Sequence, residues 1–199
     1  MDIQQIKSNF EKKGYFFSFF DTPDSAREYL LSKISGKSVG IGGSMTVKEL
    51  GLYEGLCREN DVHWHWEQGE AARIPAASAQ VYICSANALS EKGDIVNIDG
   101  NGNRTSATMY GHDDVYIICG TNKLTPDFPS ALHRARNIAS PLNARRLGAD
   151  TPCANSSSEL RCYDCSSPGR ICRAVAWLMA KPNGIKHMEI ILIHGELGY

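Results

Sequence analysis

The alternation of short apolar runs with helix-forming segments is the feature that most restricts how this chain can fold. Apolar runs bounded by polar residues predict strands, and they lie at 38–41, 61–66, 80–84, 94–99 and 113–119. After the last of them, residues 127–148 predict a long helical stretch divided near Pro141. Parallel strands need crossover connections, and these are most economically helical. The sequence therefore predicts the α/β class, with helices flanking a largely parallel sheet.

The two ends of the chain depart from this alternation. Residues 1–36 predict two N-terminal helices, because apolar residues recur at helical spacing over 2–13 and Thr22 precedes a proline at the start of the second helix. Near the other end, the runs 173–180 and 187–195 read as two strands joined by "KPNGIK". We expect them to form a C-terminal antiparallel hairpin that closes the sheet.

Length and charge limit the classes of protein to which the chain can belong. With 199 residues, of which 42% are hydrophobic, the chain has enough apolar material for one domain over 1–199. Its formal net charge of -1, with acidic and basic residues interspersed, argues against a nucleic-acid partner. We find no apolar run long enough for a membrane span and no signal peptide at the N-terminus, so we expect a cytoplasmic protein.

The glycine run "VGIGGSMTVKELG" at 39–51 lies between a predicted strand and a predicted helix. It lacks the Lys-Ser/Thr pair of a P-loop and the third glycine of a dinucleotide fingerprint. Gly42 and Gly43 could adopt positive φ and point backbone N–H groups at an anion, and Ser44 and Thr46 could add hydroxyl donors. Thr46 and Glu49 also fit a capping box. The alternative is that the glycines only form a corner between strand and helix.

A second polar loop, "VNIDGNGNR" at 96–104, also follows a predicted strand. If both strands are parallel, both loops emerge at the same sheet edge and face one cleft. Arg104 could then hold a carboxylate or phosphate, and Asp99 could act as a base or bind a hydroxyl group. In "CGTNKL", Asn122 and Lys123 follow the next strand and are directed to the same edge, with Lys123 as a candidate anion ligand. The alternatives are ordinary turn chemistry at Asp99 and a solvated lysine at 123.

Four of the seven cysteines fall in the segment 150–173, which has the composition of a loop. Their spacing is C-x8-C-x2-C-x6-C, and flanking Gly, Ser and Pro allow the irregular backbone that convergent ligands need. The pattern predicts a metal site, either zinc or an iron–sulfur cluster, at Cys153, Cys162, Cys165 and Cys172. Disulfides or free thiols are the alternatives. Cys57, Cys84 and Cys119 lie in apolar segments, and we expect them to be small residues of the core.

Several of these motifs together resemble the LUD (lactate utilisation) domain proteins. The resemblance runs through "GIGGSMTVKELGL", "SANALSEKGDIVNIDGNGNR", "GTNK", "RARNIASPLNARRL", "TPCA", the cysteine segment and "ELGY", and so covers the chain from about residue 38 onward. It implies a fold like that of ribose-phosphate isomerase, glucosamine-phosphate deaminase and the CoA-transferases. It also implies a part in the oxidation of lactate to pyruvate, usually beside iron–sulfur protein subunits.

The family pattern, carried over position by position, marks candidate site residues. They are Gly42, Gly43, Ser44, Thr46, Glu49, Asp99, Gly100, Gly102, Asn103, Arg104, Asn122, Lys123, Arg136, Asn137, Pro141 and Asn143. Among them, Asp99 and Glu49 are the candidate catalytic carboxylates. The chain departs from the larger iron–sulfur members of the family because it lacks their ferredoxin-like extension. We therefore expect an enzyme or enzyme subunit acting on a small carboxylate or phosphorylated metabolite, with a non-catalytic metal-binding or docking subunit of an iron–sulfur complex as the alternative.

Overall fold

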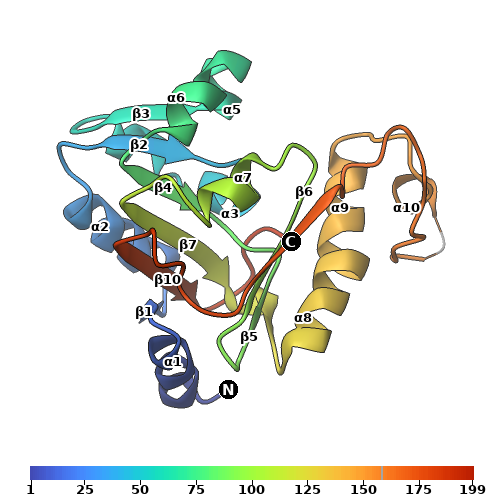
Figure 1. Ribbon diagram of the computed structural model, residues 1–199, viewed down its shortest axis with the longest axis horizontal. Coiled ribbons are helices and arrows are strands. Elements are labelled where there is room, and N and C mark those ends of the chain that lie inside the picture. The colour runs from blue at the N-terminus through green and yellow to red at the C-terminus, as the bar shows by residue number, and fades with distance from the viewer. Residues whose placement is uncertain (158) are drawn as a thin grey trace.

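The computed structural model describes residues 1–157 and 159–199 and contains two sheets (Figure 1). The larger sheet has six strands, all parallel, in the order β1-β10-β7-β4-β2-β3. Their bounds are β1 Phe16–Phe20, β10 His187–Ile193, β7 Asp114–Gly120, β4 Val81–Cys84, β2 Ser38–Ile41 and β3 Asp61–Trp64. The predicted α/β class with a largely parallel sheet is confirmed.

The smaller sheet is mixed and has the order β8-β5-β6-β9. Its strands are β8 Leu124–Thr125, β5 Ala88–Ser90, β6 Ile95–Asp99 and β9 Ala174–Leu178. Strand β6 is antiparallel to both of its neighbours, whereas β5 and β8 are parallel. The run 94–99 is therefore a strand as predicted, but it belongs to a second sheet.

The predicted C-terminal hairpin is wrong, because β9 and β10 belong to different sheets. Residues 188–193 of β10 are buried on both faces, as is usual for an inner strand of a parallel sheet, and β10 lies between β1 and β7. Strand β9 instead exposes three of its five residues and pairs with β6. The "KPNGIK" segment carries the chain from one sheet to the other rather than forming a tight turn.

Ten α-helices are found in the described part of the chain. Their bounds are α1 Ile3–Lys12, α2 Pro23–Lys33, α3 Met45–Glu49, α4 Tyr53–Leu56, α5 His65–Gln68, α6 Arg73–Ala77, α7 Asn103–Ala107, α8 Phe128–Arg134, α9 Ser140–Arg146 and α10 Pro152–Asn155. The two opening helices are confirmed, but strand β1 lies between them and was not predicted. The run 61–66 is a strand only as far as Trp64, because α5 begins at His65.

The helical stretch after β8 forms a single rod in Figure 1, not two separate helices. Helices α8 and α9 are joined by a π-helical turn at Ala135–Ala139, directly before Pro141. Proline has no N–H group, so the carbonyl of Asn137 lacks its usual partner four residues on. The predicted break near Pro141 is thus a widening of the helix that keeps its direction.

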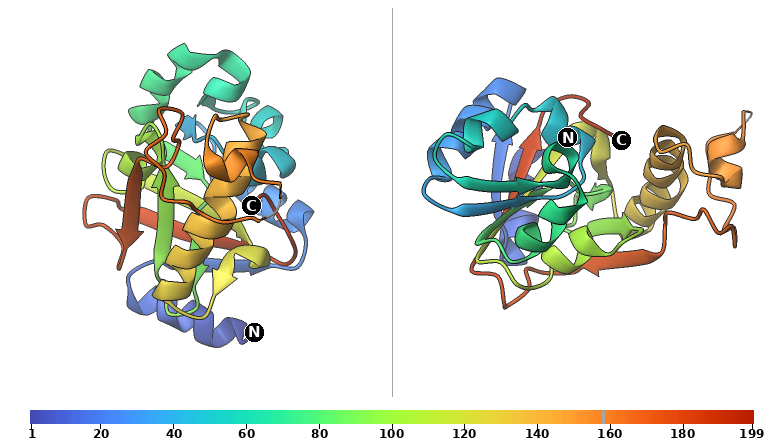
Figure 2. Two further views of the ribbon diagram at one scale, coloured as in Figure 1. Left: turned by 90° about the vertical axis from the view of Figure 1, so that its right-hand side faces the viewer. Right: turned by 90° about the horizontal axis from the view of Figure 1, so that it is seen from above.

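Apolar side chains fill both faces of the larger sheet. On one face, Phe10 of α1 and Leu89 of the smaller sheet belong to the same apolar cluster as Ile190. On the other face, Leu30 of α2 packs in the same cluster as Ile191. Helix α8 covers the outer side of the smaller sheet, which therefore lies between the larger sheet and the rod (Figures 1 and 2). The strand period of two explains how neighbouring residues of β10 serve opposite core layers.

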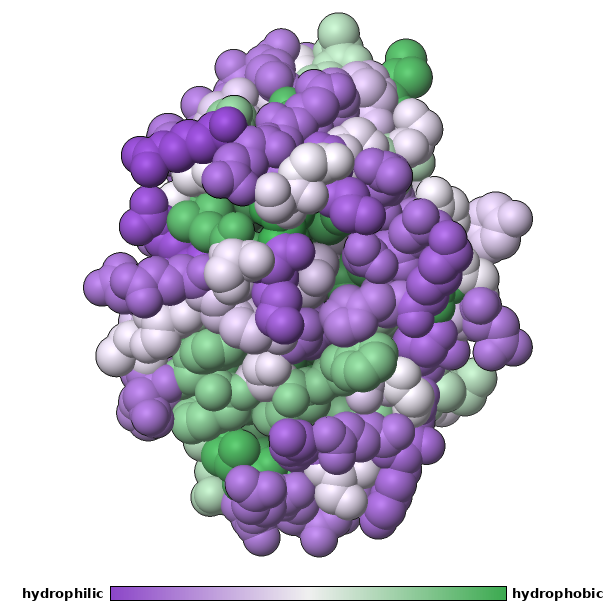
Figure 3. All heavy atoms as spheres, turned by 90° about the vertical axis from the view of Figure 1, so that its left-hand side faces the viewer, coloured by the Kyte–Doolittle hydropathy of each residue, from purple (hydrophilic) through white to green (hydrophobic). Residues whose placement is uncertain are grey.

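The outer surface is mixed in character. One face carries a band of apolar surface bordered by hydrophilic regions (Figure 3). None of the helices in the described residues is both long enough and apolar enough to cross a membrane.

Candidate functional site

A cleft of about 310 Å³ opens where the two sheets and the α8–α9 rod meet. The first glycine loop contributes Gly43 and Ser44 to its lining, and the second loop contributes Asp99, Gly100 and Arg104. The structure therefore brings the two loops to one hollow. The reason given by the sequence was incomplete, because β2 and β6 lie in different sheets and reach the cleft from two directions.

The glycines of the first loop are required by close contacts rather than by a left-handed backbone. Neither Gly42 nor Gly43 has a positive φ. A Cβ atom at Gly42 would lie 2.8 Å from the Tyr82 hydroxyl, and one at Gly43 would lie 3.3 Å from the Trp66 ring. The expectation of positive φ at these positions is wrong, and the lack of a side chain is what lets the loop fit against β4 and α5.

The predicted capping box of Thr46 and Glu49 is also wrong, because helix α3 begins two residues earlier than that box requires. Ser44 is the N-cap, and its hydroxyl accepts a hydrogen bond from the Val47 N–H at 3.2 Å. Thr46 instead donates to the Leu197 carbonyl at 3.1 Å, and Glu49 accepts from the Gly198 N–H at 2.8 Å. Both side chains fasten the "ELGY" segment, and neither lines the cleft.

Lys123 is buried at the inner end of the cleft. Its ammonium group donates to the Thr46 hydroxyl at 2.8 Å and to the Ser85 hydroxyl at 3.0 Å, and its residue is only 4% exposed. Within residues 1–157 and 159–199, no carboxylate forms an ion pair with it. Burial lowers the pKa of Lys123 to about 8. The alternative of a solvated lysine is therefore excluded.

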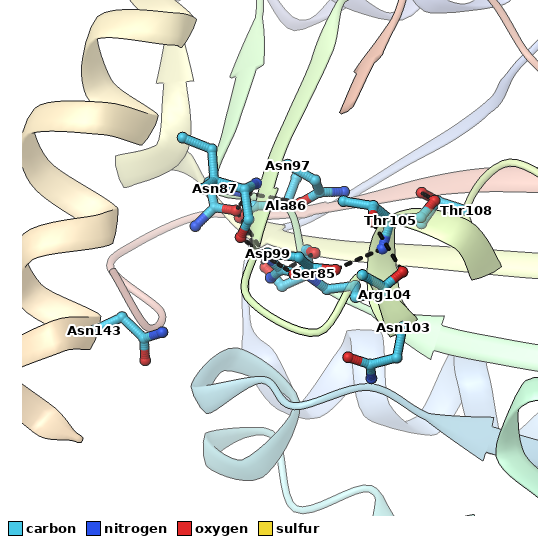
Figure 4. Close-up of polar contacts among 12 residues, drawn as sticks. Ser85, Ala86, Asn87, Asn97, Asp99, Asn103, Arg104, Thr105, Thr108 and Asn143 are labelled. Atoms are coloured by element: carbon cyan, nitrogen blue, oxygen red, sulfur yellow. Dashed lines mark hydrogen bonds and ion pairs between the residues drawn. The ribbon is translucent and has the colours of Figure 1, made fainter. Parts of the chain in front are cut away.

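Asp99 and Arg104 form an ion pair within the second loop (Figure 4). The Arg104 guanidinium lies 3.0 Å from one Asp99 oxygen and also donates to the Asn87 side chain at 2.7 Å. The other Asp99 oxygen accepts from the Thr105 N–H at 2.7 Å and so caps α7. Much of the hydrogen-bonding capacity of both side chains is used within the protein, which fits a role in holding the loop.

The lining of the cleft is strongly basic. Six basic side chains line it: Arg73, Arg104, Lys123, Arg146, Arg170 and Arg173. Of the lining residues that the structure describes, Asp99 alone has a carboxylate side chain, and that carboxylate is paired with Arg104. Positive charge concentrated in a partly enclosed cleft favours a negatively charged ligand.

Arg146 is a part of the site that sequence reasoning missed. It lies at the end of α9, over the Trp66 ring at 5.1 Å, and it lines the cleft. It also donates to the Asn143 side chain at 2.8 Å. Its contact is with a residue 80 positions earlier in the chain, and no local pattern reports a contact of that kind.

The remaining predicted residues fall into four groups. Asn103 and Asn143 line the cleft, and Asn143 reaches toward it from α9, opposite the second loop (Figure 4). Asn122 hydrogen-bonds the backbone of Leu197 and Gly198, so it supports the same segment as Thr46. Arg136 points away from the cleft to the cysteine segment. Gly42, Gly102, Asn137 and Pro141 do not line the cleft.

The four cysteines of the segment 150–173 line a second, smaller cavity. Cys153, Cys162, Cys165 and Cys172 are all free, and each is partly exposed. Residue 158 of this segment lies outside the described residues. A set of thiol donors fits zinc or an iron–sulfur cluster chemically. Of the other cysteines, Cys84 and Cys119 are buried as predicted, whereas Cys57 is exposed and the prediction of a core position for it is wrong.

Comparison with known proteins gives a family match and a similar solved structure. The family model described as LUD domain matches residues 3–193. The crystal structure of a DUF162 family protein from Deinococcus radiodurans is similar over 96% of this chain and 95% of that chain, with a TM-score of 0.58 and 10% sequence identity. At that identity the likeness shows the fold alone. A search of curated proteins finds no match.

Proposed function

The chain belongs to the LUD-domain family, which is associated with lactate utilisation, and from this premise we propose that its cleft binds a small organic anion. The ligand is a carboxylate or a phosphorylated metabolite of lactate-to-pyruvate oxidation, and the chain acts there as an enzyme or as a subunit. The proposal is carried by one observation: six basic side chains line the cleft, and the one carboxylate side chain in its described lining is already paired with Arg104.

The basic residues have different roles in this proposal. Lys123 and Arg146 are the ligand-binding residues. Among the described residues, no carboxylate pairs with Lys123, and Arg146 contacts an amide and an aromatic ring rather than a carboxylate. Arg104 is a positioning residue, since it already binds Asp99 and Asn87. Asp99 accordingly holds the second loop and Arg104 in place, rather than serving as a base.

Titration calorimetry with lactate, pyruvate and a sugar phosphate tests the proposal. We expect at least one of these anions to bind, and we expect Arg146→Met to weaken that binding by about tenfold or more, because a hydrogen bond to a charged group contributes roughly 1.5–3 kcal/mol. Arg145→Met is the matched control. It lies on the same helix, does not line the cleft, and should change the affinity by less than about twofold.

Two outcomes would count against the cleft as the binding site. One is that none of the three anions binds to the folded protein. The other is that an anion binds but Arg146→Met and Arg145→Met have the same effect on its affinity.

A second function, a metal-binding subunit of an iron–sulfur oxidoreductase complex, is favoured by the four thiols that line one cavity. The two functions differ in what the isolated chain does. Turnover of lactate by the purified chain would refute a purely non-catalytic role. Co-purification with a ferredoxin-like partner, together with no turnover in isolation, would support that role.

A further inference from the structure

The cysteine cavity has the donor chemistry of a metal–thiolate centre. Its lining combines four thiols with the apolar side chains of Pro141, Ala144 and Ile171. None of the described residues that line it is Asp, Glu or His. Apart from the Ser140 and Thr151 hydroxyls, the donors that these side chains offer are thiols, which favours zinc or iron–sulfur over the metals that prefer oxygen.

Hydrogen-bonding groups lie beside two of the four sulfurs. The Asp164 N–H donates to the Cys162 sulfur at 3.3 Å, and the Arg136 guanidinium donates to the same sulfur at 3.7 Å. The Thr151 hydroxyl lies 3.4 Å from the Cys153 sulfur. Hydrogen bonds to ligating sulfurs are a means by which proteins stabilise such centres and set their potentials.

Arg170 fixes the positions of two of the four cysteines. Its guanidinium donates to the Cys165 carbonyl at 2.7 Å and to the Cys172 carbonyl at 2.8 Å. One side chain thus ties together two ligands that are seven positions apart in a segment without regular structure. Ordering of this kind is what a preformed ligand set requires.

Four thiols, with no carboxylate or imidazole in the described lining, fit both a zinc ion and an iron–sulfur cluster. Zinc has no redox chemistry, whereas an iron–sulfur cluster takes up and releases electrons. The choice of the cluster rests on the proposed function, because the oxidation of lactate to pyruvate releases electrons that need an acceptor.

The cysteine cavity also shares a wall with the basic cleft. Ser140, Arg170, Ile171 and Cys172 line both cavities. Cys172 is the member of the cysteine set that belongs to both linings, and Arg170 is a basic residue of the cleft that binds the cysteine backbone. A centre held by these thiols would therefore border the cleft.

We propose that Cys153, Cys162, Cys165 and Cys172 bind an iron–sulfur cluster, and that Cys172 places this cluster at the wall of the basic cleft. The bound cluster supplies a one-electron centre beside the anion. The chain's own residues supply the thiolates, the hydrogen bonds to sulfur and the wall that separates the cysteine cavity from the basic cleft. The cluster part of the inference does not depend on which anion the cleft binds.

Anaerobic reconstitution of the full chain with iron and sulfide tests the cluster. We expect bound iron and sulfide in about equal amounts, about four of each per chain for a cubane, with broad visible absorption and an electron paramagnetic resonance signal after reduction. The four single Cys→Ser variants should each lower the bound iron to less than about half of the wild-type value. Cys57→Ser is the matched control, because Cys57 is exposed and lies outside the cavity. Circular dichroism establishes that each variant is folded.

Three results would overturn the cluster. They are stoichiometric zinc in place of iron in protein exposed to both metals, no iron above the background of the quadruple Cys→Ser variant, and loss of iron in Cys57→Ser equal to that in the cavity variants. All three are measured without an anion, so they leave the proposed function of the cleft untouched.

The position of the cluster is tested separately, by adding pyruvate to the reduced, reconstituted protein. We expect the resonance signal to shift in wild type and to remain unshifted in Arg146→Met at the same pyruvate concentration. A signal that pyruvate leaves unchanged, in a protein shown by calorimetry to bind pyruvate, would overturn the placement of the cluster at the cleft wall.

Discussion

At the scale of single residues, the burial of Lys123 determines how the cleft should respond to pH. Burial brings its pKa down to about 8 from an ordinary value of 10.5. The unfolded chain therefore binds this proton more tightly than the folded chain does. Below pH 8 the buried ammonium opposes folding, and this opposition fades as the pH rises from about 8 to 10.5. The buried ammonium thus lowers the stability of the fold, and it lies where its positive charge would most strengthen the binding of an anion.

We expect the affinity for the anion to be nearly constant below pH 8 and to fall above it, by up to about tenfold per pH unit, because the neutral amine no longer attracts the ligand. Calorimetry from about pH 6.5 to about pH 9.5 measures this dependence. In Lys123→Met, the affinity should be low and the fall above pH 8 should be absent. The same steep fall in that variant would show that another group is responsible.

At the scale of the elements, the "ELGY" segment is held next to Lys123 by three side chains, which come from α3 and from the turn after β7. Thr46 and Glu49 of α3 and Asn122 of the turn after β7 all bind its backbone. Gly198 has φ of +58°, and a Cβ atom there would lie 2.6 Å from the Thr46 hydroxyl oxygen and 3.2 Å from the Lys123 nitrogen. Because the Thr46 hydroxyl is itself bound to Lys123, this segment helps to set the position of the amine.

We expect Gly198→Ala to lower both the thermal midpoint and the anion affinity. Alanine at positive φ costs about 1 kcal/mol, and the contact with Thr46 adds to that cost and displaces Lys123. Gly36→Ala is the control, since Gly36 has φ of +65° and nothing within 4 Å of the added Cβ. It should lower the midpoint by less and leave the affinity unchanged. Equal losses of affinity in the two variants would mean that the segment does not position Lys123.

The elements also show where sequence reasoning succeeds and where it stops. The apolar runs of β2, β4 and β7 could be predicted because a strand buried on both faces is a local pattern. The wrong hairpin arose because β9 and β10 are close in sequence but pair with β6 and β7, which are distant. Pairing between strands is set by non-local packing, and local propensity does not report it.

Within the site, the same limit separates the predicted residues from the missed ones. The two glycine loops could be found because their composition is unusual in itself. The reason for glycine at 43 is a ring contributed by Trp66, and the role of Arg146 depends on the same ring. Contacts of this kind appear only when the elements are assembled, which is why the sequence indicated the loops but not the basic rim.

At the scale of the whole molecule, the cysteine segment lies outside the two main layers of the core. No described residue of 150–173 belongs to either of the clusters that fill the faces of the larger sheet. Only Cys172 packs against the third cluster, beneath α8. Helix α10 accordingly lies beyond α9, at the far end of the molecule from α2 (Figures 1 and 2). Ordering of this segment and stability of the sheet are therefore separable.

This separation predicts the effect of removing the metal from the reconstituted protein. Stability varies across a structure, and a region with few core contacts opens at a lower free energy than the core does. After anaerobic chelation we expect faster hydrogen exchange in 150–173 and in the adjoining α9. Exchange in β7 and β10, whose residues fill both core layers, should stay within about twofold of that in the metal-bound protein. Chelation of the quadruple Cys→Ser variant is the control and should change neither region. Loss of protection throughout β7 and β10 would show instead that the cysteine segment and the sheet fold as one unit, in the way that small zinc domains depend on their metal.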